Sequence, residues 1–427
     1  MNELNERQQK LDLIRIEKVQ PGLKVRYTGE EEITERIWYI ALDDIEKNYC
    51  MDLEEGRVFS AGGYDAHKDW DGLTFNRDTC YSGLLALNLL YPKEMLQSMK
   101  IIRKYRERLK FACTPDMELE GIEGVEVFDL TFREFKVRFH KGAAINKTDD
   151  VVWIWCMYDL IKKNHFDEWE WMYHTAKRHF EQFYDPFYDP EDGLYFGQPT
   201  FIDVGSNGYP ESFGMKTKEA YNYGVWVKAS STNSLYYKAL TVMSEAAKRL
   251  GLEEEAEEWD ERAAHLKAAI LDKLRFEDGT FAYFMHKDGH LENRREVLGT
   301  AFPVLLDVVT KEEAQKALKG FPVTAFGAPL LVPFYDHEST LHNNSSWPFA
   351  DTFLLLAFEK AYEVNLVKLN LQIMVNATEN GHLREYRNMI KNQMCGATAQ
   401  LWSCAGFVNA CIRGGLTEID PEKILMR

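Results

Sequence analysis

The sequence lacks the features that would place it in several common classes. Its apolar runs stay below the ~18 residues that a membrane-spanning helix needs. The N-terminus, MNELNERQQKLDLIRIEK, has no apolar core of the kind that a secretory signal carries. Basic residues are scarce, since 51 Lys and Arg stand against 68 Asp and Glu, a net charge of −17. Nucleic acid and anionic membranes both require a basic surface, so neither is expected as a partner, and we predict a cytoplasmic globular protein.

Motifs for nucleotides, metals and disulfides are also missing. No Walker loop, GxGxxG fingerprint or GxSxG elbow occurs, which leaves nucleotide-dependent and serine-hydrolase chemistry without support. His337 and His342 lie among acids in YDHESTLHNNSSWPF, but no HxxxH or HExxH spacing accompanies them, so we expect no metal and no cofactor. The seven cysteines form no CxxC pair and are interpreted as reduced, mostly buried thiols. They are Cys50, Cys80, Cys113, Cys156, Cys395, Cys404 and Cys411.

Aromatic residues, by contrast, reach 13% of the chain. Several stand in stretches such as GGYDAHKDWDG and FYDPFYDPEDGLYFG, whose Gly and Asp content is typical of loops. An aromatic ring has an apolar face and, in Tyr and Trp, a polar edge, which suits the apolar face and hydroxyl rim of a sugar. The alternative is that these rings only cap the core.

Residues from Glu31 onward alternate between helix-period segments and loops. About twelve helices are predicted, with no Pro-, Gly- or Ser-rich linker between them and no repeat of fixed length. We therefore expect one closed all-α domain over residues 31–427, preceded by a short extended arm over residues 1–30. The long connections collect Asp, Trp, Tyr, Gly and Asn, so function is expected at the end of the domain where they lie.

Two predicted helix starts carry unusual polar residues. In DWDGLTFNRDTCYSG, Arg77 and Asp78 lead into a helix, where a cap with a local ion pair is the alternative to a role in binding. In NKTDDVVWIW, Thr148 is the predicted N-cap, and two acids occupy the first turn ahead of Trp153 and Trp155.

Two carboxyl groups suit an acid and a base. Asp203, in QPTFIDVGSNGYP, has apolar neighbours and no Lys or Arg within ten residues on either side. Burial without a cation raises a carboxyl pKa, as a general acid requires, although a loop Asp can also simply form an Asx-turn. Glu385, in ENGHLREYRNMIKNQMCGATAQLWS, lies between Arg384 and Arg387. Neighbouring positive charge favours the ionised form, which suits a general base.

Taken in order, these segments resemble the six-hairpin glycosidases. That superfamily has an (α/α)6 barrel and includes trehalases, processing α-glucosidases, glucosylglycerate or mannosylglycerate hydrolases and debranching glucosidases. The trehalase signature WDxSSRW is missing, and Val204 replaces the Trp that usually follows the acid. The likeness covers most of the chain from about Trp38 to Gly415. It is carried by FNRDTCYSGLLAL, TDDVVWIWCMYDLI, DPEDGLYFGQPTFIDVGSNGYP, KASSTNSLYYKALTVMSEAAKRLG, LHNNSSWPF and REYRNMIKNQMCGATAQLWSCAG.

The resemblance implies a glycoside hydrolase that cleaves an α-glycosidic bond with inversion. It implies Asp203 as the general acid and Glu385 as the general base, with Glu379 as the alternative base. The side chains implied to bind the substrate are Trp70, Asp71, Arg77, Asp78, Asp149, Asp150, Trp153, Tyr209, His342, Asn343, Trp347 and Trp402.

Three other functions stay open at this point. An inverting phosphorylase would need an anion site, for which Arg77, Arg384 and Arg387 are the candidates. A sugar epimerase would use His residues as acid and base, and a non-catalytic protein would bind sugar without turnover. Each of these has a small carbohydrate as its partner, and a homo-oligomer is left open as well.

Overall fold

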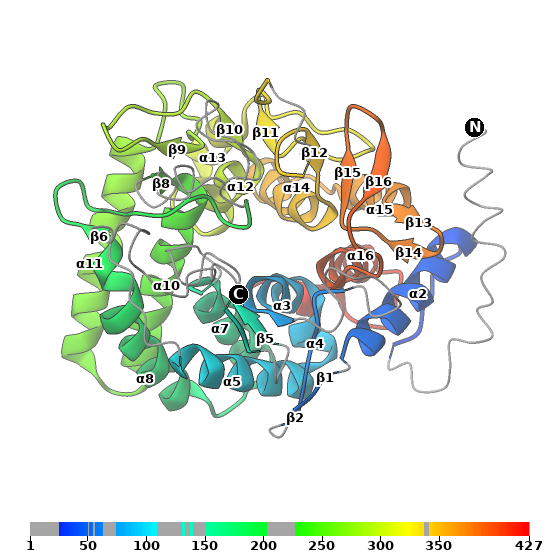
Figure 1. Ribbon diagram of the computed structural model, residues 1–427, viewed down its shortest axis with the longest axis horizontal. Helices are drawn as coiled ribbons and strands as arrows, with labels where there is room; N and C mark the ends of the chain where they lie inside the picture. Colours follow the sequence, from blue (N-terminus) through cyan, green and yellow to red (C-terminus); the bar gives the residue numbers. More distant parts are fainter. Residues whose placement is uncertain are drawn as a thin grey trace.

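The computed structural model describes residues 25–49, 51–53, 56–62, 74–108, 130–132, 137–139, 150–202, 227–336 and 341–426. Within these residues the chain forms twelve helical segments in two concentric rings (Figure 1). The inner ring comprises α3 (Asn76–Ser82) with its continuation through the π-helical turn η2 (Gly83–Leu87) and α4 (Asn88–Leu90), then α7 (Val152–Asn164), α10 (Ser230–Arg249), α12 (Val297–Leu305), α14 (Pro348–Tyr362) and α16 (Leu401–Arg413).

The outer ring alternates with the inner one along the chain. Its members are α2 (Glu32–Asn48), α5 (Pro92–Arg108), α8 (Trp169–His179) with the π-helical turn η3 (Phe180–Tyr184), α11 (Glu253–Lys273), α13 (Lys311–Leu318) and α15 (Val367–Asn376). Each inner helix packs against the next one in chain order, and α16 packs back against α3, so the ring is closed. The predicted all-α, (α/α)6-barrel fold is confirmed.

Helix composition explains which ring each helix joins. Twelve of the thirteen residues of α16 are buried, because it is apolar or small on every side. Only five of the twenty-one residues of α11 are buried, and they follow one stripe of an otherwise charged helix. A helix that is apolar all round must lie inside, and an amphipathic one covers it from outside.

Aromatic rings fill the lumen of the barrel. The ring centroid of Tyr81, in α3, lies within 6.1 Å of the ring centroids of Phe302, Phe349 and Phe353. Trp155 of α7 contacts Phe302 and Phe353 from another side. The barrel is therefore a packed core rather than a channel.

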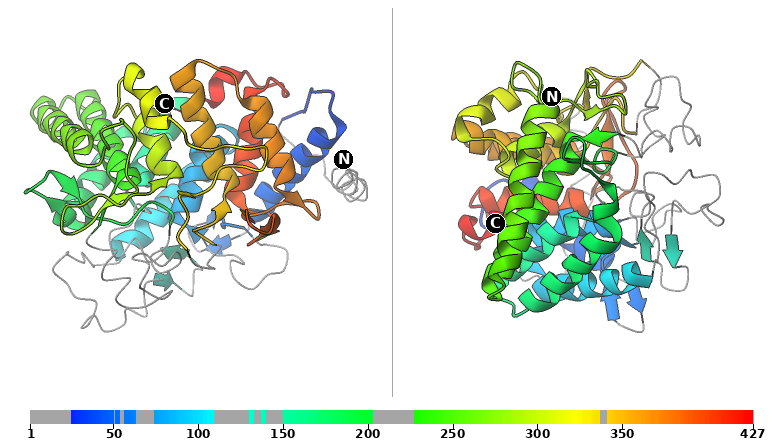
Figure 2. Two further views of the ribbon diagram at one scale, coloured as in Figure 1. Left: turned by 90° about the horizontal axis from the view of Figure 1, so that it is seen from above. Right: turned by 90° about the vertical axis from the view of Figure 1, so that its left-hand side faces the viewer.

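Short strands lie in the connections, and most of them gather at one end of the barrel (Figure 2). The two three-stranded sheets are β12–β15–β16 and β3–β5–β4, and the remaining pairs are antiparallel. Strands β3, β8, β10 and β12 run almost directly into the inner helices α3, α10, α12 and α14, so the N-termini of these helices face the strand-bearing end. The strands are β1 (Met51–Leu53), β2 (Gly56–Val58), β3 (Thr74–Phe75), β4 (Leu130–Phe132), β5 (Val137–Phe139), β6 (Tyr188–Asp189), β7 (Leu194–Tyr195), β8 (Lys228–Ala229), β9 (Phe284–Met285), β10 (Arg295–Glu296), β11 (Leu331–Val332), β12 (Ser345–Ser346), β13 (Thr378–Glu379), β14 (His382–Leu383), β15 (Tyr386–Asn388) and β16 (Gln393–Cys395).

The predicted N-terminal arm is described only from residue 25. Tyr27 forms a β-bridge with Thr417, and the Thr28 N–H donates to the Leu416 carbonyl at 2.8 Å. Residues 1–24 lie outside the described residues, so the domain division at residue 30 stays a prediction. None of the described helices is long and apolar enough to cross a bilayer.

Glu296 caps the N-terminus of α12 from a fully buried position. Its carboxyl oxygens accept hydrogen bonds from the Leu298 N–H at 3.1 Å and the Gly299 N–H at 2.7 Å, and Ser231 bonds to it as well. Burial outweighs these bonds and raises the pKa of Glu296 from 4.5 to about 8.

Replacing Glu296 with Gln should therefore flatten the pH dependence of stability between about pH 5 and pH 8. The folded wild type keeps the Glu296 proton up to about pH 8, whereas the unfolded chain releases it near its ordinary pKa of about 4.3. Stability thus falls with rising pH in this window, by at most ~1.4 kcal/mol per pH unit for this group. Urea unfolding across the window measures the slope.

The matched control is Glu313→Gln. Glu313 belongs to the capping box of outer helix α13, and its pKa is lowered, first by the hydrogen bond from the Thr310 backbone. Its contribution is lost only as pH falls below about 4.5, so this variant should keep the wild-type slope. An unchanged slope in Glu296→Gln would contradict the protonated, buried state.

Candidate active site

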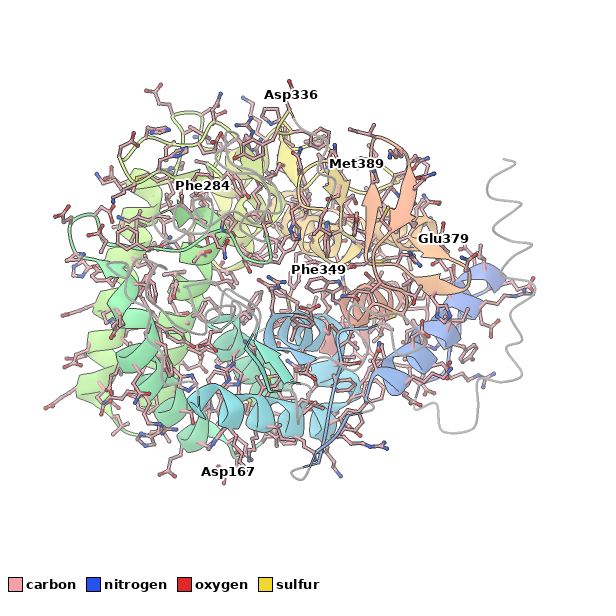
Figure 3. The ribbon with its side chains drawn as sticks, viewed as in Figure 1. Asp167, Phe284, Asp336, Phe349, Glu379 and Met389 are labelled. Carbon is pink, nitrogen blue, oxygen red and sulfur yellow. The ribbon has the colours of Figure 1, made fainter. Side chains whose placement is uncertain are left out.

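An aromatic cluster forms where α14 and α16 begin. Trp402, in the first turn of α16, stacks on Phe349 of α14 with ring centroids 4.0 Å apart and meets Trp347 edge-on at 5.6 Å. Phe201, in the connection before α10, packs against Trp347 at 5.5 Å and Phe349 at 5.1 Å. Figure 3 shows Phe349 near the centre of the ring of helices. These four rings, Phe201, Trp347, Phe349 and Trp402, are called the aromatic floor below.

Arg77 and Asp78 lie beside the aromatic floor at the start of α3, and both are nearly buried. The Arg77 guanidinium carbon is 5.9 Å from the centroid of the Trp402 ring. Asp78 Oδ1 accepts a hydrogen bond from Gln400 Nε2 at 3.3 Å, and Asp78 Oδ2 lies 3.8 Å from Arg77 Nε. Arg77 and Asp78 thus form the local ion pair that was one alternative, and they also lie beside the aromatic floor.

Glu385 immediately precedes β15 and is nearly buried, with 7% of its surface exposed. Its carboxylate Oε2 accepts the Ala397 N–H at 2.8 Å, and its own N–H donates to the Ala397 carbonyl at 3.1 Å. Gly396, beside this pair, has φ +75°, and a Cβ there would collide with the Glu385 carboxylate. The backbone therefore orients the carboxylate, and a glycine is needed to leave room for it.

The arginines that flank Glu385 in the sequence make other contacts. The Arg387 guanidinium donates to the Asn376 carbonyl and to Asn392 Oδ1, and Arg384 Nε lies 3.9 Å from Glu379 Oε2. Successive side chains of an extended segment point to opposite sides, so Arg384 and Glu385 need not share surroundings. The Ala397 N–H is one contact that orients Glu385.

His342 and Trp347 belong to a stack of three rings. The His342 ring lies 5.1 Å from the Trp347 ring, and Tyr386 lies 5.3 Å from Trp347 on a nearly parallel plane. Asn343 has a structural contact, since its side chain bonds the N–H and the carbonyl of Tyr335, each at 2.8 Å. His342 thus borders the aromatic floor, and Asn343 holds the loop behind it.

Asp150 and Trp153 lie between the two rings of helices instead. Asp150 pairs with the buried Arg103 of α5, and the Arg103 guanidinium lies 5.1 Å from the Trp153 ring centroid. Trp153 also meets Trp171 and His179 of the outer ring. The structure therefore does not bring Asp150 and Trp153 to the aromatic floor. Trp155, two residues after Trp153 on the same helix, points into the lumen instead.

Glu379, the alternative base, lies on the β13–β14 hairpin, and 39% of its side chain is exposed. In Figure 3 it lies toward the rim of the molecule, well away from Phe349 at the centre. The remaining predicted site residues, Trp70, Asp71, Asp149, Asp203 and Tyr209, lie outside the described residues.

Several residues of the site were not singled out in the sequence. Gln400, Phe349 and Tyr386 stand next to residues that were, within QLWS, SSWPF and REYRN, and that adjacency was the available signal. Gln400 Oε1 and Trp402 Nε1 are buried with no hydrogen-bond partner among the described residues. The described part of the chain contains no group of three or more His, Cys, Asp or Glu side chains that could hold a metal ion.

Comparison with known proteins gives a consistent result. Residues 169–403 match the family model described as the mannosylglycerate hydrolase MGH1-like glycoside hydrolase domain. No curated protein matches the chain. Solved structures with the same fold include a wild-type glycosidase (13% identity, TM-score 0.59, covering 91% of this chain and 100% of that one).

Two further structures share the fold at similar distance. The GH63 mannosylglycerate hydrolase from Thermus thermophilus, in complex with Tris and D-glycerate, is 13% identical with a TM-score of 0.61, covering 87% of this chain and 99% of that one. A sialidase is 15% identical with a TM-score of 0.62, but the present chain, of which 91% is covered, spans only 34% of that longer chain.

Replacing Gly396 with Ala should lower the free energy of unfolding by more than the cost of placing a side chain at a residue with positive φ. The matched control is Gly251→Ala, because Gly251 has φ +72° and nothing within 4 Å of where its Cβ would lie. That control should lose about 1–2 kcal/mol from the left-handed backbone alone. Gly396→Ala must also displace the Glu385 carboxylate, so its free energy of unfolding should fall further, as denaturant titration of both variants measures. Equal losses would mean that Glu385 does not occupy the space beside Gly396.

Proposed function

The chain belongs to the mannosylglycerate hydrolase MGH1-like glycoside hydrolase family, and we propose that it cleaves an α-glycosidic bond with inversion, using Asp203 as general acid and Glu385 as general base. That the protein is a glycoside hydrolase acting on a carbohydrate follows from the family. The stereochemistry and the two catalytic residues are the proposal.

One observation supports the pairing of these two residues. Phe201, two residues before Asp203, packs on Trp347 at 5.5 Å, and Tyr386, the residue after Glu385, stacks on the same ring at 5.3 Å. Two segments far apart in the chain thus converge on one indole at the end of the barrel where function is expected. Inverting glycosidases hold their two carboxyl groups ~6.5–9.5 Å apart, with a water between one of them and the sugar.

The reaction then proceeds in one displacement. Glu385 takes a proton from a water molecule while the water oxygen forms a bond to the anomeric carbon. The bond from that carbon to the leaving oxygen breaks, and Asp203 gives its proton to that oxygen. The sugar is released with the opposite anomeric configuration, and a proton exchange with solvent returns both carboxyl groups to their starting states.

The pocket residues suit the binding of a neutral sugar ring. The aromatic floor offers an apolar face, and Asp78, Arg77 and Gln400 offer polar groups at its edge. Gln400 Oε1 and Trp402 Nε1 supply an acceptor and a donor for hydroxyl groups. Mannosylglycerate and glucosylglycerate head the panel of test substrates, together with aryl α-glycosides, because the family takes its name from a mannosylglycerate hydrolase.

Asp203→Asn and Glu385→Gln should each lower kcat by about 10²–10⁴, since each removes one acid–base group and leaves the pocket shape intact. Glu379→Gln should keep near-wild-type kcat, because its half-exposed carboxylate faces Arg384 on the rim hairpin. Steady-state release of free sugar measures all three. If Glu379→Gln loses activity and Glu385→Gln keeps it, the base is Glu379.

The stereochemistry is tested separately by proton NMR of the first product. Inversion predicts that the β-anomer appears before mutarotation when an α-glycoside is cleaved. Added inorganic phosphate should leave the rate unchanged and yield no sugar phosphate. An initial α-anomer, or phosphate-dependent turnover, would overturn the inverting hydrolysis.

A further inference from the structure

The segment that leads into Asp203 ends in a strained turn. Phe201 has φ +50°, and the Ile202 N–H donates to the Thr200 carbonyl at 2.7 Å, which closes a three-residue turn around Phe201. A γ-turn with positive φ at a residue that has a side chain is rare and costs on the order of 1–3 kcal/mol. Such a conformation persists only where the surroundings hold it in place.

Side chains from two inner helices hold Thr200, the first residue of this turn. The Tyr81 hydroxyl of α3 lies 2.7 Å from Thr200 Oγ1, and Ser231 Oγ of α10 accepts the Thr200 N–H at 3.2 Å. Ser231 in turn bonds Glu296, the cap of α12, so a third inner helix joins the network. Tyr81, Thr200 and Ser231 are all buried, and water therefore does not compete for these bonds.

The residues before and after Thr200 are also held in place. Upstream, Thr232 Oγ1 donates to the Gln198 carbonyl at 2.5 Å. Downstream, the Phe201 ring packs edge-on against Trp347 and Phe349 of the aromatic floor. The backbone is thus fixed before, at and after Thr200, within two residues of the proposed general acid.

We propose that Tyr81, Thr200 and Ser231 are positioning residues for the general acid, acting through the strained turn at Phe201. The inference rests on the proposed role of Asp203. A general acid must reach the leaving oxygen to within a fraction of an ångström, and a displacement of about 1 Å can cost up to 10²-fold in rate. The alternative is that these hydrogen bonds only stabilise the core at the start of α10.

The test compares two substrates that differ in their need for an acid. A glycosyl fluoride loses fluoride without protonation, whereas a glycosylglycerate needs a proton on its leaving oxygen. Tyr81→Phe and Thr200→Val remove the hydroxyl bond and keep the side-chain shape. Both should lower kcat on mannosylglycerate by about 10- to 100-fold, with KM little changed, and should change kcat on α-mannosyl fluoride by less than about threefold. The glucosyl pair replaces the mannosyl pair if the wild type prefers it.

Two further variants make the result decisive. Thr200→Ser keeps the hydroxyl and should restore the wild-type ratio of the two rates. Tyr173→Phe removes a buried tyrosine hydroxyl that bonds Glu255 in the outer ring, and it should leave both rates unchanged. Equal losses on both substrates in Tyr81→Phe and Thr200→Val, or no loss on either, would overturn the positioning role.

Asp203→Asn, measured in parallel, separates this inference from the function it rests on. If Asp203→Asn shows no difference between the glycosyl fluoride and the glycosylglycerate, the assignment of the general acid fails. If Asp203→Asn shows the difference and neither hydroxyl variant does, only the positioning role fails. Thermal unfolding of each variant confirms that the compared proteins are folded, and Thr200→Val serves alone if Tyr81→Phe does not fold.

Discussion

Closure of the inner ring between its first and last helices is the constraint on which the site depends. Asn409 of α16 donates a buried hydrogen bond to the Leu85 carbonyl at 2.8 Å, within the π-helical turn that continues α3. A π-helical turn departs from the regular α-helical bonding pattern, and it often marks a functional position. At the other end of the same seam, Gln400 bonds Asp78. Asp78 and Gln400 therefore lie on the seam that closes the barrel, and they come together only when it is closed.

The packed lumen decides where chemistry can occur. Tyr81, Phe302 and Phe353 occupy the axis, and Phe349 and Trp402 lie above them as part of the aromatic floor. The N-termini of inner helices α3, α10, α12 and α14 lie at the strand-bearing end of the barrel. An apolar floor at that place also strengthens each polar contact made beside it, because the local dielectric constant is low.

The sequence predicts the fold well and the site in part. Helical periodicity and the absence of linkers were enough for one closed domain of about twelve helices, because each helix carries its own pattern of burial. The ring arrangement followed from the resemblance to the six-hairpin glycosidases. Arg77 and Trp402 could be selected because they stand in unusual local stretches. The surroundings of Glu385 could not be predicted, since its carboxylate is oriented by the backbone of Ala397, across a hairpin. The sequence also could not show that Asp150 lies away from the aromatic floor, because its partner Arg103 belongs to another helix.

The proposed acid and base are held by different physical devices. The segment before Asp203 depends on side-chain hydrogen bonds from inner helices and on a strained residue, Phe201. Glu385 depends on backbone bonds within a hairpin, and on a glycine that leaves space. Because Phe201 and Tyr386 both pack on Trp347, that indole is the common reference for the two segments. The proposed inverting reaction therefore rests on ring contacts in the packed core, where the two segments meet.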